Sequence, residues 1–281
     1  AGEVGRAPRT TLAQKVRLGA AALSEALRAG ARGARRGLFA LYLAVLIPLV
    51  TLPVWLVALV IPSRGLTSAL GRLGTRVGLR LMGCRLSARG LEHVPPDGAV
   101  VLACNHASYT DVFALEALLP RDLVFVAKKE VRGYPIIRTF VRRLGYPTVD
   151  RLDFKKSLDD AEQVTRALID GAAVVFFPEG TFVAATGLRP FRLGAFKTAA
   201  VAGVPVVPMA LRGTRQLLRG DEKLPHPGPI HLDVAEPVTV DGDDLHALIR
   251  LRDRTADAIA ARCGEPRLDI VAAGVERRKE E

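Results

Sequence analysis

The sequence predicts an α/β protein with a mixed, largely parallel central sheet flanked by helices, preceded by an N-terminal membrane-anchoring helical segment. From residue 99 onward, short β-like apolar runs alternate with helix-like segments, which favours this class. Two of the apolar runs end in polar motifs, as strands do at the ligand-binding edge of an open sheet. Upstream lies a long uncharged stretch. Together these features predict a globular domain behind an anchor.

Composition divides the 281-residue chain into three parts. Residues 1–36 carry eight Lys or Arg against two acids and form a basic N-terminal segment. Residues 37–84 contain the apolar stretch and an amphipathic segment, and residues 85–281 are long enough to bury one core.

Residues 38–61 contain no charged side chain, and this length exceeds the roughly 20 residues that cross a bilayer as a helix. Pro48 and Pro53 interrupt the pattern, so the segment is either a single span or a helical hairpin that dips into one leaflet. The basic flank at residues 32–36 predicts a cytoplasmic N-terminal side. We therefore expect the protein at the cytoplasmic face of the inner or plasma membrane.

The next segment, residues 66–81, has the period of an amphipathic helix. Leucines and a valine recur every three or four residues on one face, while Arg72, Arg76 and Arg80 line another. A basic amphipathic helix beside an apolar anchor suits an anionic lipid surface. Ordinary packing on the globular domain is the alternative.

The remaining pattern predicts the elements of the sheet and its helices. Strands are expected at 99–104, 123–127, 146–149, 172–178, 204–211 and 230–235, and helices at 111–119, 157–170, 191–202 and 243–262.

A formal charge of +11 favours an anionic partner. Aromatic residues make up only 5% of the chain and do not alternate with basic residues, so nucleic acid is not expected as the partner. The sequence has no G-x-S-x-G elbow, P-loop or H-E-x-x-H helix, and no ligand spacing that predicts a metal site.

His106 and Asp111 lie five positions apart, directly behind the apolar run 100–104. A neutral imidazole can take a proton from a hydroxyl, and a carboxylate on its second nitrogen fixes the tautomer and stabilises the imidazolium. The pair therefore predicts a general base, although the same spacing also occurs by chance in surface loops.

A second junction follows about seventy residues later, where the run 172–177 enters Pro178-Glu179-Gly180-Thr181. The carboxyl ends of parallel strands face one crevice, so the two loops are expected to converge. Glycine allows a ligand to approach the backbone closely, and the threonine hydroxyl and nearby amides can donate to an anion. The alternative is a simple turn.

Asn105-His106-x-x-x-x-Asp111 followed by Phe-Pro-Glu-Gly-Thr resembles the glycerolipid acyltransferase family, whose best-known members are the 1-acylglycerol-3-phosphate acyltransferases. Further segments similar to those of the family follow in order over residues 85–235: Ala127-Lys128-Lys129-Glu130-Val131, Thr148-Val149-Asp150-Arg151, Pro190 to Phe196 and Val204 to Pro208.

The resemblance implies that His106 and Asp111 are catalytic and that a lysophospholipid hydroxyl accepts an acyl group from acyl-CoA or acyl-carrier protein, which act as co-substrates, with no cofactor. It also implies substrate-binding roles for a further set of residues: Asn105, Lys128, Arg151, Glu179, Gly180 and Thr181.

One residue departs from the family pattern. Phe182 follows Thr181, where the family usually has an arginine suited to a phosphate. The expected acceptor is 1-acyl-sn-glycerol 3-phosphate, and Lys128, Arg151, Arg189 or Arg192 could supply the missing charge. Because of Phe182, glycerol 3-phosphate, another lysophospholipid or an amino-lipid remains an alternative acceptor, and a non-catalytic membrane scaffold is a second alternative.

Overall fold

A computed structural model of the chain describes residues 12–149, 154–183, 185–220, 222–242 and 244–268. The chain divides at Pro48 into two units, Ala1–Pro48 and Leu49–Glu281, which are described separately. The domain boundaries expected at residues 36 and 84 stay predictions.

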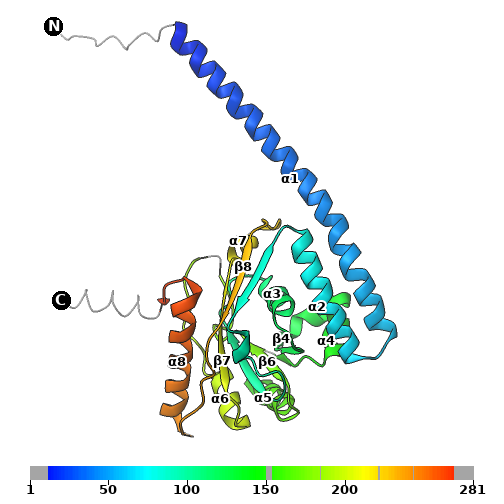
Figure 1. Cartoon of the computed structure of the whole chain (residues 1–281), viewed down its shortest axis with the longest axis vertical. Coiled ribbons are helices and arrows are strands. Elements are labelled where there is room, and N and C mark those ends of the chain that lie inside the picture. Colours follow the sequence, from blue (N-terminus) through cyan, green and yellow to red (C-terminus); the bar gives the residue numbers. More distant parts are fainter. Residues whose placement is uncertain (1–11, 150–153, 184, 221, 243, 269–281) are drawn as a thin grey trace, which may run out of the picture. The chain divides into compact units, whose positions relative to one another are not determined.

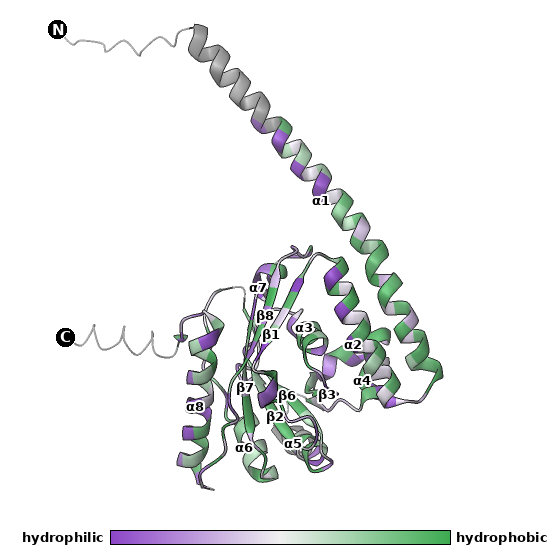
Figure 2. Ribbon diagram, viewed as in Figure 1, coloured by the Kyte–Doolittle hydropathy of each residue, from purple (hydrophilic) through white to green (hydrophobic). Residues whose placement is uncertain are grey.

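The long helix α1 runs from Leu12 to Val60. It continues as one helix through Pro48 and Pro53, so the hairpin alternative does not occur in this structure. Each proline removes one backbone donor, which leaves the carbonyl four residues earlier without its usual helical partner. Residues Leu27–Val60 are long and apolar enough to cross a membrane, a property that core helices and signal sequences can share. Figure 2 shows the apolar character of the later turns of α1.

The last turns of α1, from Leu49 onward, pack against α2 (Arg64–Leu81) and α4 (Pro135–Leu144). Gly74 allows the close approach of α2, because a Cβ atom there would lie 3.4 Å from a methyl group of Val54. From α4, Arg143 donates to the carbonyls of Ala58 and Leu59 at 2.6 and 2.8 Å. These contacts satisfy carbonyls at the end of α1 that have no partner within the helix.

The helix expected at 66–81 is confirmed as α2, but its faces are used in an unusual way. Thr67, Ser68 and Leu79 are buried on the globular side, and Leu70 of the predicted stripe is partly buried. The other apolar side chains of the stripe are exposed: Leu66, Leu73, Val77 and Leu81. Arg72 pairs with Asp122, and Arg76 donates to the carbonyl of Ala117 at 2.9 Å. Arg72 and Arg76 therefore hold protein groups, while Arg80 is exposed, as are the outward apolar side chains of α2.

The central sheet has six strands in the order β1-β8-β7-β2-β6-β3. β2 pairs in parallel with both β6 and β7, β3 with β6, and β1 with β8, while β7 and β8 are antiparallel. The predicted mixed, largely parallel sheet is confirmed. Its strands are β1 (Arg85–Arg89), β2 (Val100–Cys104), β3 (Leu123–Phe125), β6 (Ala173–Phe176), β7 (Val206–Arg212) and β8 (Pro229–Val234).

Helices cover both faces of this sheet, as Figure 1 shows. On one face, α3 (Asp111–Leu118) packs with the end of α2 on alternate residues of the strands, including Leu102 and Met209. On the other face, α5 (Phe154–Ile169), α6 (Gly194–Ala202) and α8 (Leu245–Cys263) pack on the intervening residues, including Val101 and Ala210. Strands that are apolar on both faces are expected of a buried parallel sheet.

The sequence missed the elements that lack a long apolar run. β1 is polar on alternate residues, and α4 begins at Pro135 within a basic segment. The strand expected at 146–149 belongs to a second, two-stranded sheet rather than the main one. The short elements are β4 (Ala127–Lys128), β5 (Thr148–Val149), the 3-10 helices η1 (Leu91–His93) and η2 (Lys129–Gly133), and α7 (Thr214–Leu217).

Candidate active site

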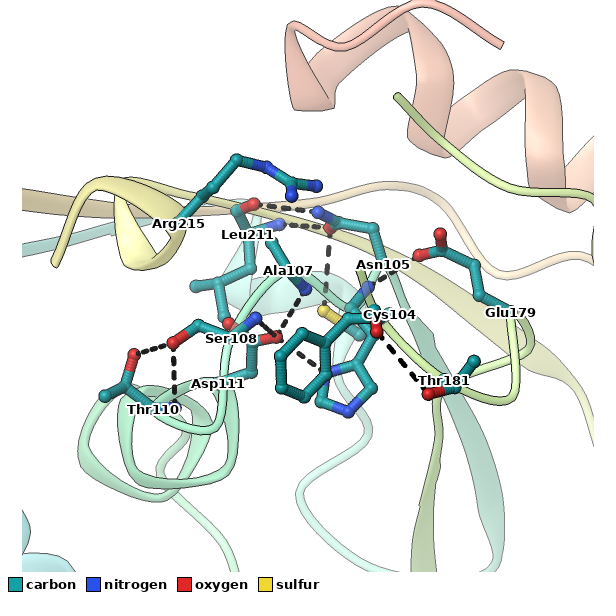
Figure 3. Close-up of polar contacts among 12 residues, drawn as sticks. Cys104, Asn105, Ala107, Ser108, Thr110, Asp111, Glu179, Thr181, Leu211 and Arg215 are labelled. Carbon is teal, nitrogen blue, oxygen red and sulfur yellow. Dashed lines mark hydrogen bonds and ion pairs between the residues drawn. The ribbon is translucent and has the colours of Figure 1, made fainter. Parts of the chain in front are cut away.

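The two predicted motifs begin at the carboxyl ends of neighbouring central strands. β2 and β6 are paired in parallel, with Ala103 opposite Phe176, so their following loops leave the sheet side by side. The convergence expected from the sequence is confirmed by direct contacts between the loops, which Figure 3 shows.

His106 and Asp111 form a hydrogen-bonded pair, with 2.7 Å between Nδ1 of the imidazole and Oδ2 of the carboxylate. The same oxygen accepts the backbone N–H groups of Ala107 at 2.7 Å and Ser108 at 2.9 Å. Asp111 is the first residue of α3, where the helix dipole favours a negative charge, and its side chain is fully buried. The carboxylate thus fixes both the imidazole and the loop that carries it.

The imidazole of His106 lies between two phenylalanine rings. It stacks on Phe177 with 4.0 Å between ring centroids, and Phe182 meets it edge-on at 4.6 Å. Tyr109 in turn contacts Phe182 at 4.7 Å. The imidazole side chain keeps 16% of its surface exposed, so the ring is enclosed by aromatic groups without being sealed.

Asn105 is buried, and its amide pairs with the backbone of Leu211 on β7. Nδ2 donates to the carbonyl at 3.0 Å, and Oδ1 accepts the N–H at 2.7 Å. The side chain thereby continues the hydrogen bonding between β2 and β7 beyond the end of β2. These contacts make Asn105 a residue that positions the His106 loop, and its contact with substrate stays a prediction.

Glu179 joins the two loops. Oε1 accepts the backbone N–H of His106 at 2.7 Å, and Oε2 accepts that of Arg189 at 2.9 Å. Burial raises the pKa of this carboxyl to about 7, although the two N–H donors act in the opposite direction. Both carboxylate oxygens are used within the protein, so the geometry gives Glu179 a positioning role.

Gly180 and Thr181 form the turn after Glu179. Gly180 has a φ of 77°, in the left-handed region that favours glycine, and its N–H donates to the carbonyl of Phe177 at 2.9 Å. A Cβ atom on Gly180 would lie 2.8 Å from Nε of Arg192. The Thr181 hydroxyl makes a long 3.5 Å contact with the carbonyl of Phe182.

A further pair, which the sequence reading did not single out, holds the loop after Phe182. Arg215 and Glu265 make two parallel hydrogen bonds, at 2.7 and 2.8 Å. Arg215 also donates to the carbonyls of Val183 and Ala185, and Glu265 accepts the N–H of Gly187. No local motif marks these residues, because the pair joins segments that are far apart in the sequence.

The two other residues predicted to bind substrate, Lys128 and Arg151, are not part of these two loops. Lys128 is exposed in β4, in the small second sheet. Arg151 lies outside the described residues. Their substrate-binding roles stay predictions.

Three comparisons with known proteins place the chain among similar sequences and structures. Residues 85–212 match the acyltransferase family. The chain is 37% identical over 160 residues to a 1-acyl-sn-glycerol-3-phosphate acyltransferase of Chlamydomonas reinhardtii, covering 56% of this chain and 48% of the relative. It is 28% identical over 172 residues to one of Cocos nucifera, covering 61% and 55%. The chain thus spans about half the length of these relatives.

Among solved structures, the 1-acyl-sn-glycerophosphate acyltransferase PlsC from Thermotoga maritima aligns with a TM-score of 0.69 at 20% identity, over 82% of this chain and 98% of that one. This likeness supports the fold. The class of protein is therefore an α/β domain with a mixed, largely parallel sheet covered by helices on both faces. Over residues 85–212 the chain is similar to the acyltransferase family, and the resemblance read from its sequence is confirmed.

Proposed function

We propose that this protein is a membrane-associated O-acyltransferase that moves a fatty acyl group from a thioester to a lysophospholipid hydroxyl. The observation that carries the proposal is the 2.7 Å pairing of His106 Nδ1 with the buried carboxylate of Asp111, at the edge of the sheet where α/β proteins bind ligands. The names of the relatives favour 1-acyl-sn-glycerol 3-phosphate as acceptor, which would give phosphatidic acid.

In the proposed reaction, Nε2 of His106 takes the proton of the acceptor hydroxyl as that oxygen attacks the thioester carbonyl. The C–S bond then breaks, and the departing thiolate takes the proton from the imidazolium. Asp111 holds the tautomer that leaves Nε2 able to accept the proton. The reaction needs no acyl-enzyme intermediate.

Charge develops on the carbonyl oxygen during this attack and needs hydrogen-bond donors. The backbone N–H groups of His106, Ala107 and Ser108 already donate to carboxylates. The oxyanion donors therefore have to come from other groups around the cleft or from the substrate.

Membrane association is the second part of the proposal. The apolar stretch Leu27–Val60 of α1 supports it, as do the outward apolar side chains of α2. Such an anchor suits an acceptor and a product that reside in the bilayer. The basic flank at residues 32–36 favours the cytoplasmic face, where anionic lipids would meet it.

The test is an acyl-transfer assay by mass spectrometry, with the purified protein in lipid micelles. Acyl-CoA and acyl-carrier protein are each offered with lysophosphatidate, glycerol 3-phosphate and neutral lysolipids. We expect phosphatidic acid from lysophosphatidate, formed at least about 100-fold more slowly by His106→Ala. A wild-type protein that is folded but transfers no acyl group to any acceptor would favour a scaffold role instead.

The membrane proposal has a separate test. After cell lysis, the full chain should remain in the membrane fraction through a carbonate wash, which releases peripheral proteins. Release into the supernatant would contradict it without bearing on acyl transfer.

A further inference from the structure

Arg192 is an exposed cation attached to the turn that follows β6. Its backbone N–H donates to the carbonyl of Pro178 at 2.9 Å, which ties the start of the following segment to this turn. Its guanidinium lies over Gly180, since a Cβ atom there would be 2.8 Å from Nε and 3.0 Å from Cζ. The absence of a side chain at 180 is thus what makes room for the guanidinium.

Within the part of the chain that the structure describes, the guanidinium of Arg192 has no ion pair or hydrogen bond. The acid nearest in sequence to the turn, Glu179, uses both oxygens for the N–H groups of His106 and Arg189. A guanidinium with five donors and no acidic partner is suited to an anion from outside the chain, and phosphate matches its planar geometry.

The same turn lies beside the candidate base. Phe177 and Phe182, which flank residues 178–181, both contact the imidazole of His106. Position 182 carries an aromatic ring and offers no charge to a substrate. At this turn Arg192 therefore supplies a charged donor, and Thr181 supplies a hydroxyl.

We propose that Arg192 binds the phosphate of the acceptor and supplies the positive charge that Phe182 lacks. This inference rests on the proposed function, and it defines the acceptor as a phosphate monoester. In 1-acylglycerol 3-phosphate only a few covalent bonds separate the attacking oxygen from phosphorus. Arg192 is tied to the turn whose flanking phenylalanines contact His106, so its guanidinium would hold the phosphate while the hydroxyl meets the imidazole. Thr181 would donate to a second phosphate oxygen.

The experiment compares Arg192→Gln and Arg192→Lys with the wild type, using lysophosphatidate and monoacylglycerol as acceptors. Monoacylglycerol offers a similar hydroxyl without the phosphate. Because charge-assisted hydrogen bonds are strong, Arg192→Gln should lower kcat/KM for lysophosphatidate by about 10- to 100-fold. Most of this loss should be a rise in KM. Activity with monoacylglycerol should change by less than about twofold, and Arg192→Lys should keep an intermediate activity with lysophosphatidate.

Arg262→Gln is the matched control, because this exposed arginine on α8 makes only a local contact, to the carbonyl of Ala258, in the described structure. It removes the same charge and should leave both acceptors unaffected. Circular dichroism and thermal unfolding establish that each variant is folded.

Three results would overturn the proposal. They are an unchanged kcat/KM for lysophosphatidate in Arg192→Gln, an equal loss with both acceptors, and a rise in the KM of acyl-CoA alone, which would assign the cation to the phosphates of the donor. Failure of the wild type to acylate any acceptor would instead refute the proposed function, so the two failures are distinguishable.

Discussion

The carboxylate of Glu179 accepts the backbone N–H of His106 at 2.7 Å, although the two residues are 73 positions apart. The contact links the ends of two neighbouring strands through one side chain. It means that the position of the candidate base depends on a residue that need not touch the substrate.

His106→Ala should lower kcat by about 10²- to 10⁴-fold, the usual contribution of positioned proton transfer. Asp111→Asn should have a comparable effect, because Asp111 Oδ2 accepts three hydrogen bonds, one of them from the imidazole. The measurement is the single-turnover rate of acyl transfer. A His106→Ala protein that retains its activity would remove the imidazole from the mechanism.

Glu179→Gln should lower kcat by about 10- to 100-fold. Its amide NH₂ would face the N–H of His106 or Arg189, and a buried donor without a partner costs about 1–3 kcal/mol. The readout is the pH profile of kcat/KM. Burial keeps the pKa of Glu179 at about 7, so its charge is lost as the pH falls through neutrality, and the Gln variant should lack this component. Glu222→Gln on the exposed surface is the control.

Arg215→Ala and Glu265→Ala should each destabilise the protein, since each leaves its partly buried partner charge uncompensated. In a double-mutant cycle we expect a coupling energy of about 1–3 kcal/mol from thermal unfolding. Both variants should also slow acyl transfer, because the loop that carries Phe182 loses its attachment. Additive effects on stability would show that the two side chains act independently.

Glu116 on α3 is buried, and its Oε2 has no hydrogen-bond partner among the described residues. Burial raises its pKa from 4.5 to about 7, with Arg72 acting in the opposite direction. The folded protein therefore holds this proton at a pH where the unfolded chain has released it. Stability from this group is fully present below pH 4.5 and is lost as the pH rises through about 7.

Glu116→Gln should accordingly have a higher Tm than the wild type at pH 8 and a similar one at pH 4.5. Thermal unfolding in detergent across this range checks the prediction, with Glu92→Gln on the exposed surface as the control. Parallel curves for the wild type and Glu116→Gln would show that the buried carboxyl does not set the pH dependence.

The sequence alone predicted the α/β class, the central strands and the convergence of the two motifs. These features follow from apolar runs such as 100–104 and 173–176, which have few alternatives to a buried parallel sheet. Local pattern also sufficed for the pairing of His106 with Asp111, because both residues belong to one loop.

The long-range contacts of the site could not be predicted from the sequence, for a physical reason. The amide of Asn105 meets the backbone of Leu211 across 106 positions, and Arg215 meets Glu265 across 50. Side chains of these types are common on surfaces, and only the folded chain brings such partners together. The outward apolar face of α2 was ambiguous as well, because its period of three to four residues indicates a helix without indicating which side is covered.

The two loops of the site are held by different means. The His106–Asp111 loop is closed by its own backbone amides, whereas the segment after Phe182 is fastened by a distant ion pair. Insertions or substitutions among residues 183–187 would therefore leave the hydrogen bond between His106 and Asp111 intact. The two loops are thus open to independent change, in evolution or by design, because neither relies on the other's fastening.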